Sequence, residues 1–312
     1  MRNDVVTVFG GSGFLGRYVV RRLANAGARV RVICRHPHKA IHLKPMGEVG
    51  QITLERGDVT KTDDLSPYIE GSRHVVNLIG ILFEKGDQRF DVIQAETPAR
   101  IAAAAAAAGV ERLVQLSAIG ADPESPAAYG RTKAAGEAAV REAFPAATIL
   151  RPSVVFGPED DFFNRFGQMA QISPFLPLID GGETRFQPVY VDDVARAVIL
   201  GLTEKETAGR TYELGGPDVY TFRELLAYLL EQLHRKRLLL TLPSNIAMIQ
   251  ARFMEMLPKP PLTRDQIALL ASDNVVSEGA AGFAELDIKP TPLEVIVPSY
   301  VQRYAKRQPR AV

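Results

Sequence analysis

The chain has 312 residues, a length typical of one large α/β domain with a smaller lobe. Its 37 basic and 36 acidic residues nearly cancel, which argues against an electrostatic surface for nucleic acid. The single cysteine, Cys34, excludes an intramolecular disulfide and fits a reducing compartment. The first predicted strand leaves no room for a signal peptide, and no apolar run has the length of a membrane span. We therefore expect a cytoplasmic protein, soluble or peripherally bound to a membrane.

Strands and helices alternate through the first half of the chain. We expect strands at residues 5–9, 29–34, 51–56, 74–79, 112–117 and 147–150. The clearest helix between them is rich in alanine and covers residues 92–108. Alternating βαβ units predict an α/β fold with a doubly wound parallel sheet and right-handed crossovers.

A glycine-rich turn joins the first strand to the first helix. Free backbone N–H groups and the positive end of the helix dipole converge at such a turn, and a side chain there would block a pyrophosphate. Glycines alone also fit an ordinary tight turn, but this strand–turn–helix context favours dinucleotide binding. We expect contacts along the whole turn, from Gly10, Gly11, Ser12, Gly13, Phe14, Leu15 and Gly16.

The residue that follows the second strand bears on the choice between the two nicotinamide cofactors. Proteins that prefer NAD usually carry an acid there, which holds the ribose 2′-hydroxyl. This chain has Arg35 within a basic segment, and a guanidinium can pair with a 2′-phosphate. A solvated basic loop is the alternative. We expect NADP, held as NADPH, in preference to NAD.

Two further segments fit the same cofactor. Asp58 and Val59 follow the third strand, where an acid can meet the adenine amino group. The fourth strand closes with a small residue that leaves room for the adenosine ribose, in the run Asn77, Leu78, Ile79 and Gly80. Aspartate and glycine are also common turn residues, so each segment alone fits an ordinary loop.

A tyrosine and a lysine lie four residues apart after the fifth strand. Tyr129 and Lys133 fall on one face of a helix predicted to begin after Pro126. A nearby ammonium lowers the pKa of a phenol toward the range useful for proton transfer, and the same ammonium can hold ribose hydroxyls. A surface pair on a helix is the alternative. Their place behind a nucleotide turn favours a chemical site.

The regular alternation ends after Arg151. Prolines and glycines interrupt the chain until the run at residues 187–194, which we expect to return to the main body. The prediction is a dinucleotide-binding domain over residues 1–157, to which residues 187–213 return. A smaller, mostly helical lobe is expected over residues 158–312.

These motifs together resemble the extended short-chain dehydrogenase/reductase superfamily, whose nucleotide domain is a Rossmann sheet. The resemblance rests on the glycine turn, residues 77–80, Tyr129 with Lys133, and the runs at residues 150–153 and 189–194. It implies that the tyrosine is an acid/base and that the lysine orients the cofactor. It also implies that a segment beside the nicotinamide is formed by Arg151, Pro152, Ser153 and Val154.

Other strings are more specific. Those at residues 42–51, 144–153, 156–161, 262–266 and 286–294 resemble the nucleotide-binding accessory subunit of respiratory complex I and its bacterial relatives. The resemblance covers nearly the whole chain. It implies tight NADPH binding without turnover and support of the assembly or stability of the membrane complex. Complex I subunits at the membrane face would then be partners, on the inner face of the cytoplasmic membrane.

The hydroxyl that polarises the substrate carbonyl in active members of the superfamily is in doubt here. Ser117 is the one hydroxyl in the segment after the fifth strand, and Ala118 and Ile119 follow it. Ser117 fits a catalytic or cofactor-binding role and equally a backbone-capping role. An active NADP-dependent reductase or epimerase therefore remains an alternative, and a binder that senses the nicotinamide redox state is a third hypothesis.

A basic and apolar segment over residues 235–257 leaves two interpretations open. It carries three consecutive cations, then a leucine run and several methionines. Such a segment can dock on a membrane or in a partner groove. The interpretation that we favour is an ordinary lobe core with solvated basic residues. The five histidines do not have the spacing of a metal site, and no metal cofactor is expected.

Overall fold

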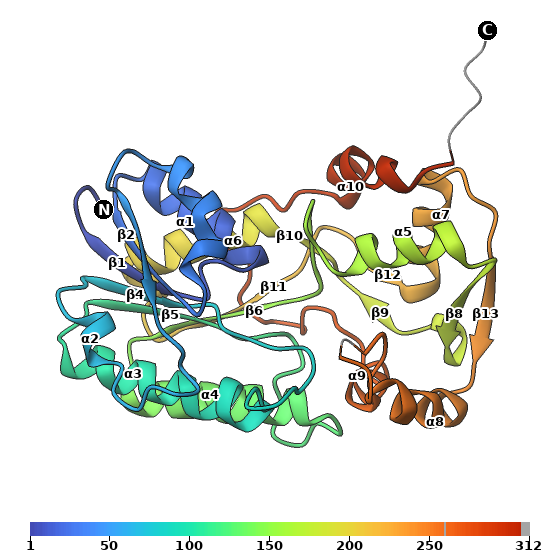
Figure 1. Cartoon of the computed structure of the whole chain (residues 1–312), viewed down its shortest axis with the longest axis horizontal. Helices are drawn as coiled ribbons and strands as arrows, with labels where there is room; N and C mark the ends of the chain where they lie inside the picture. The colour runs from blue at the N-terminus through green and yellow to red at the C-terminus, as the bar shows by residue number, and fades with distance from the viewer. Residues whose placement is uncertain (259, 307–312) are drawn as a thin grey trace, which may run out of the picture. The chain divides into compact units, whose positions relative to one another are not determined.

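The computed structural model describes residues 1–258 and 260–306, which form the two compact units drawn in Figure 1. The first unit takes Met1–Pro152, Val191–Leu214 and Ser277–Lys289. The second takes Ser153–Tyr190, Gly215–Val276 and the described residues from Pro290 onward. The chain thus leaves the first unit at Pro152, whereas we expected a boundary at Gly157, and it returns to that unit twice.

The first unit is built on a parallel sheet, as the alternating pattern predicted. In the described chain the sheet has seven strands in the order β11-β6-β5-β4-β1-β2-β3. Every pairing is parallel, and Val6 of β1 lies between Val30 of β2 and His74 of β4. The strands are β1 (Val5–Phe9), β2 (Arg29–Cys34), β3 (Ile52–Arg56), β4 (His74–Asn77), β5 (Arg112–Leu116), β6 (Thr148–Pro152) and β11 (Thr211–Leu214). The doubly wound fold is confirmed.

Helices cover both faces of this sheet (Figure 1). One face carries α1 (Phe14–Asn25) and α6 (Val191–Thr203), and the other carries α2 (Ser66–Ile69), α3 (Thr97–Ala107) and α4 (Ala128–Ala143). A 3₁₀ segment, η1 (Pro37–Met46), follows β2. Fully buried apolar side chains such as Phe9, Ile101 and Leu113 fill the core on the second face.

The predicted helix at residues 92–108 is interrupted in its first turns. Residues Asp91–Glu96 form a π-helical segment, η2, and the α-helical hydrogen bonding begins only at Thr97. The neighbouring helix α4 approaches this segment closely, because a Cβ on Gly136 would lie 1.9 Å from the carbonyl oxygen of Gln94. A π-bulge next to so close a crossing is typical of a functional region.

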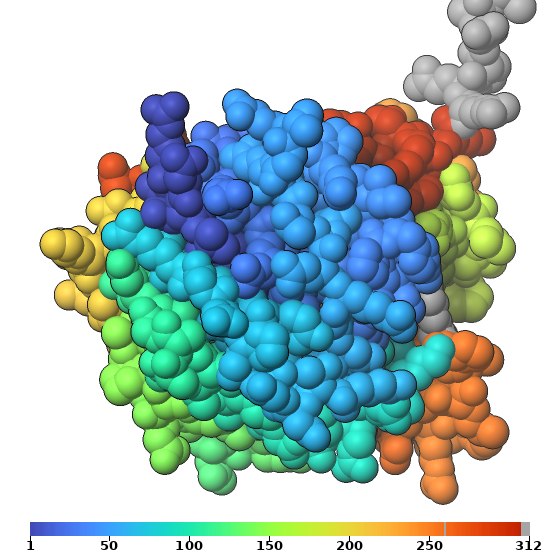
Figure 2. Space-filling model, turned by 60° about the vertical axis from the view of Figure 1, so that its left-hand side comes forward, coloured from blue at the N-terminus to red at the C-terminus, as the bar shows by residue number. Residues whose placement is uncertain are grey.

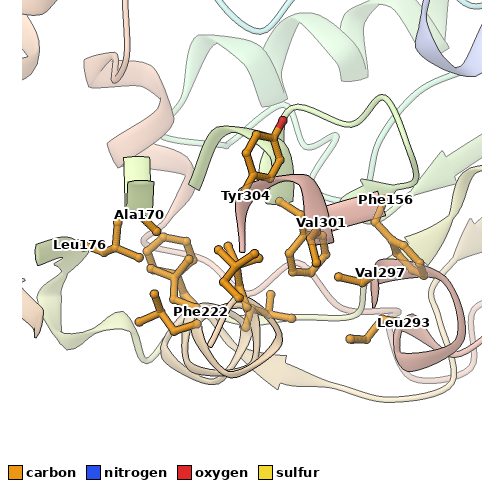
Figure 3. Packing of buried hydrophobic residues seen from close by; sticks show 14 of the residues in the cluster. Phe156, Ala170, Leu176, Phe222, Leu293, Val297, Val301 and Tyr304 are labelled. Carbon is orange, nitrogen blue, oxygen red and sulfur yellow. The ribbon is translucent and has the colours of Figure 1, made fainter. Parts of the chain in front are cut away.

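The second unit has its own core of aromatic and aliphatic side chains (Figure 3). Helices α5 (Phe162–Ile172), α7 (Phe222–Gln232) and α10 (Leu293–Val301) surround it. Phe162 contacts Phe163, Phe166 and Phe222 edge to face. Short strand pairs join β7 (Val155–Phe156) to β10 (Val189–Tyr190), β9 (Arg185–Phe186) to β12 (Tyr220–Thr221), and β8 (Phe175–Ile179) to β13 (Leu238–Leu242).

The favoured interpretation of residues 235–257 as lobe core is wrong for most of the large side chains there. In α8 (Ser244–Met254), the buried residues are Ala247 and Ala251, which pack with Ile267 of α9 (Arg264–Leu269). Of the large side chains in the segment, Leu242 packs against this cluster and Leu239 against the main core of the unit. The exposed ones are Leu238, Leu240, Ile246, Met248, Ile249, Phe253, Met256 and Leu257. Among the described residues, no helix has the length and apolar character to cross a membrane.

Candidate functional site

The glycine turn after β1 has no room for side chains at two of its positions. Gly10 has a φ of +77°, and its carbonyl accepts a hydrogen bond of 3.0 Å from the amide of Gly13. A Cβ on Gly16 would lie 2.4 Å from that same carbonyl oxygen. Gly13 is the N-cap of α1 and provides no side-chain acceptor for the first amides of the helix. The first turn of α1 is therefore open to an anion, as a dinucleotide turn requires.

The end of β4 lies against this turn. A Cβ on Gly10 would lie 3.1 Å from the carbonyl carbon of Leu78 and from the amide nitrogen of Ile79. Asn77 is fully buried; its Nδ2 donates to Gln115 at 2.8 Å and its Oδ1 accepts from the Ile79 amide at 3.1 Å. These bonds end the strand at Asn77, two residues before the predicted end, and hold the backbone of residues 78–80 beside the glycines.

Lys133 lies over the last residue of that segment. A Cβ on Gly80 would lie 3.3 Å from its Nζ, so a side chain at this position would press on the ammonium. Lys133 is only 5% exposed, and burial lowers its pKa from 10.5 to about 8, although the charge of Glu137 acts in the opposite direction. Its Nζ lies 5.8 Å from the ring centre of Tyr129, whose ring packs edge-on against Phe90. The structure thus brings together Gly80, Tyr129 and Lys133.

Arg151 connects this helix to the sheet. Its Nε and Nη2 donate to the two carboxylate oxygens of Glu137 at 2.9 and 2.7 Å, and its Nη1 donates to Glu213 at 3.4 Å. Glu137 is 5% exposed and stands one turn after Lys133 on α4. The hydrogen bond to Glu137 is the largest cause of the raised pKa of Arg151, so the guanidinium stays charged. Arg151 is therefore held within the first unit by its ion pairs with Glu137 and Glu213.

Ser117 follows β5 and carries an unsatisfied buried hydroxyl. Its amide donates to the carbonyl of Leu150 at 2.7 Å, but its Oγ has no hydrogen-bond partner among the described residues. The residue is 4% exposed. A buried hydroxyl without a partner costs on the order of 1–3 kcal/mol, so the Ser117 hydroxyl is available to hydrogen-bond a bound group.

Arg35 and Asp58 line one cavity of about 740 Å³ in the first unit. Its lining residues lie between Arg35 and Gln88, in the part of the chain coloured mid-blue to cyan in Figure 2. Burial alone would raise the pKa of Asp58. The hydrogen bonds from Thr60 and the charges of Arg35 and Lys61 together outweigh this effect, so the pKa lies below its usual value. The other basic side chains in the lining are His36, Arg56, Lys61 and Lys85. Next to Asp58, Val59 is buried.

Two of the predicted residues lie in the other unit. Ser153 donates from its Oγ to the backbone oxygen and Oδ1 of Asn274, at 2.9 and 2.7 Å. The amide of Val154 donates to the same Oδ1 at 3.1 Å. Pro152 is the last residue of β6 and of the first unit's opening stretch. Within the described chain no group of three possible metal ligands occurs.

Sequence reasoning missed three residues of the site. Glu137 stands four residues after Lys133, and helix spacing could have revealed this pair. Gln115, which fixes Asn77, and Glu213, which reaches Arg151 from β11, gave no local signal. Their roles follow from the strand order, which places β5 and β11 beside β4 and β6.

Comparison with known proteins gives a family for this geometry. Residues 6–215 match the NAD dependent epimerase/dehydratase family. The chain is 37% identical to "NADH dehydrogenase [ubiquinone] 1 alpha subcomplex subunit 9, mitochondrial" of Arabidopsis thaliana, over 98% of this chain and 79% of that protein. It is 31% identical to a ceramide reductase of Caulobacter vibrioides, over 77% of this chain and 74% of that protein.

Solved structures agree on the fold. MoeE5, in complex with UDP-glucose and NAD, superposes with a TM-score of 0.72 over 97% of this chain and 98% of its own. The two sequences are 18% identical, so this likeness concerns the fold alone.

Proposed function

Because this chain belongs to the NAD dependent epimerase/dehydratase family and to the same group as subunit 9 of the NADH dehydrogenase alpha subcomplex, we propose that it is a dinucleotide-binding accessory protein of complex I. The cofactor is a nicotinamide dinucleotide. A ligand that binds only the folded state stabilises that state by mass action, so the nucleotide has a structural use without turnover.

The fit of the site to the nucleotide carries this proposal. Gly10 and Gly16 leave a cradle that any Cβ would fill, and the first turn of α1 presents amides to a pyrophosphate. The partnerless hydroxyl of Ser117 comes directly after β5, and the buried ammonium of Lys133 lies on α4. All four residues belong to the first unit.

The form of the nucleotide is NADPH in this proposal. Arg35 stands directly after β2, and the cavity that it lines also carries Arg56, Lys61 and Lys85. Two carboxylates, Asp58 and Asp87, line it as well, and Asp87 lies 3.8 Å from Lys61. The excess of cations favours a 2′-phosphate, which carries more negative charge than a 2′-hydroxyl.

The residues around the nicotinamide end have defined tasks. When bound, the cofactor supplies a hydride donor or acceptor. Lys133 orients the ribose hydroxyls, and Tyr129 and Ser117 present hydroxyl groups for hydrogen bonding. The charge of Glu137, which is held by Arg151, favours the charged form of Lys133.

The partners in this proposal are complex I subunits at the membrane face, and the protein lies at the inner face of the cytoplasmic membrane. The test is native electrophoresis of gently solubilised membranes of the source organism, probed for this protein. Co-migration with NADH:quinone oxidoreductase activity is expected. Migration only as a small soluble species would contradict the accessory role.

A second candidate function is an active NADP-dependent reductase or epimerase. It is favoured by Tyr129 and Lys133 at their helical spacing and by the similarity to a ceramide reductase. Substrate screening with NADPH tests it, with Tyr129→Phe as the decisive variant. Turnover that Tyr129→Phe leaves unchanged would rule out this mechanism.

A further inference from the structure

A cavity of the second unit carries cations and no carboxylate. It measures about 740 Å³, and its lining includes Gln171, His234, Arg235, Arg303 and Lys306. No acidic residue is among the described residues that line it, and none of the four basic side chains forms an ion pair in the described part of the chain. A cavity of this size holds a small anionic group such as a phosphate ester.

Backbone carbonyls hold the two guanidinium groups in place. Arg235 donates from Nε to the carbonyl of Tyr304 at 2.8 Å. Arg303 donates from Nη2 to the carbonyl of Pro158 at 3.0 Å and to Oδ1 of Asn164. A guanidinium has five N–H donors, so each arginine keeps donors for an anion and loses little freedom on binding it.

Exposed apolar side chains lie next to this cavity. Ile172, which follows Gln171 at the end of α5, is 89% exposed. Phe175 and Leu238 are 45% and 67% exposed and face each other in the register of β8 and β13. Leu238 is only three residues after Arg235, which lines the cavity. The amide of Leu238 also donates a hydrogen bond to the carbonyl of Pro174, the residue before Phe175. Together Ile172, Phe175 and Leu238 are called the apolar rim.

We propose that the apolar rim and the basic cavity of the second unit bind the surface of an anionic phospholipid bilayer. The cavity takes a lipid phosphate, while the rim inserts among the acyl chains near the headgroups. Charge complementarity selects this occupant: basic residues near an anionic bilayer attract it, and apolar side chains add area-dependent affinity. An acidic protein partner would pair with the basic residues, but it would not bury the three large apolar side chains of the rim as an acyl-chain region does.

The surface is distinct from the nucleotide site, since all its residues belong to the second unit. It deepens the membrane location in the proposed function by naming the contact. Pure vesicles test it without complex I, so a failure here is distinguishable from a failure of the accessory role.

The experiment is co-sedimentation of the full chain with vesicles. One set is phosphatidylcholine alone and the other contains phosphatidylglycerol as well, each at low and at physiological salt. We expect sedimentation with the anionic set and a weaker effect as salt increases. Lys306→Gln should reduce the partition coefficient about fivefold and Ile172→Asp about tenfold or more.

Two further variants distinguish the apolar rim from the other exposed apolar side chains of the second unit. Val219→Asp changes an exposed apolar residue of the same unit that is not part of the rim, and it should leave binding unchanged. Phe253→Asp changes the exposed face of α8. The proposal is overturned if wild type does not sediment with anionic vesicles. The proposal is also overturned if Phe253→Asp abolishes vesicle binding and Ile172→Asp does not. Sedimentation of the protein that results only from its own self-association, without vesicles, overturns it as well.

Discussion

At the residue scale, the buried ammonium of Lys133 is a costly feature of the first unit. Lys133 has little solvent around it, and burial lowers its pKa to about 8. Natural chains retain such a group when its charge serves a ligand, because an apolar side chain of similar size would stabilise the fold better. Lys133 therefore lowers the stability of the fold while it places a positive charge beside Gly80 and Tyr129.

This effect leads to a prediction about stability and pH. Unfolded Lys133 keeps its proton up to about pH 10.5, whereas the folded protein releases it near pH 8. Between these pH values the folded state binds fewer protons than the unfolded state. The destabilising effect of Lys133 therefore decreases as the pH rises through this window. Replacement by methionine should stabilise the protein at pH 7 by up to ~3 kcal/mol.

Urea unfolding of wild type and Lys133→Met at pH 7 and pH 10 measures the effect. The advantage of the variant should shrink at the higher pH, where the wild-type lysine is largely neutral in the folded state. A difference between the two proteins that does not vary with pH would contradict the burial argument. Nucleotide affinity should fall in the same variant, since the proposed contact of Lys133 with the ribose would be lost.

Arg35 carries the second prediction at this scale. Arg35→Glu should weaken NADPH binding by about ten- to a hundredfold, since a hydrogen bond between charged groups contributes roughly 1.5–3 kcal/mol. NADH binding should change little or improve. Calorimetric titration with both nucleotides measures the ratio, and Lys44→Glu, an exposed basic position outside the cavity, is the matched control. Tighter binding of NADH than NADPH by wild type would contradict the assignment.

At the scale of elements, an ion pair joins helix α4, which carries Tyr129 and Lys133, to strand β6 of the sheet. Glu137 and Arg151 meet through two short hydrogen bonds, and both side chains are mostly withdrawn from water. Removing one partner of such a pair leaves an uncompensated charge, which costs more than the pair itself contributes.

Glu137→Gln should therefore destabilise the protein by about 3 kcal/mol. The matched control is Glu111→Gln, whose partner Arg73 is about half exposed and lies 2.9 Å away. An exposed pair contributes less than about 1 kcal/mol, so this control should be nearly silent. Chemical denaturation of both variants gives the comparison, and equal losses would refute the special role of the buried pair.

Some of these elements could be predicted from the sequence and others could not. Strand–helix alternation predicted six of the seven strands of the parallel sheet, with ends that differ by at most two residues, but it did not predict β11, which the chain adds after its first excursion into the second unit. The end of β4 differs because the side chain of Asn77 bonds the Ile79 amide, which periodicity does not reveal. Likewise, α8 is apolar on most sides, and composition alone could not tell that Ala247 and Ala251 form its buried face. The contact between Arg151 and Glu213 depends on pairing between strands far apart in sequence.

At the scale of the whole molecule, the two units divide the proposed roles. The predicted nucleotide contacts of the glycine turn, β4, β5 and α4 belong to the first unit, and the basic cavity with its apolar rim belongs to the second. Ser153 and Val154 are the exceptions among the predicted residues, since Asn274 of the second unit fixes both. A nucleotide held by the first unit should therefore raise the stability of the folded chain without changing vesicle binding.

The size of that stabilisation discriminates among the functions. NADPH at a hundred times its Kd should add about 2.7 kcal/mol to the free energy of unfolding of nucleotide-free protein. A structural cofactor requires this gain from the nucleotide but no difference between its redox states, whereas a redox sensor requires NADPH and NADP⁺ to bind with different affinities. Thermal unfolding with each nucleotide measures both, and Arg35→Glu serves as the control that should lose about half of the shift or more. Equal shifts would end the sensor hypothesis, and no shift with either nucleotide would remove the physical basis of the accessory role.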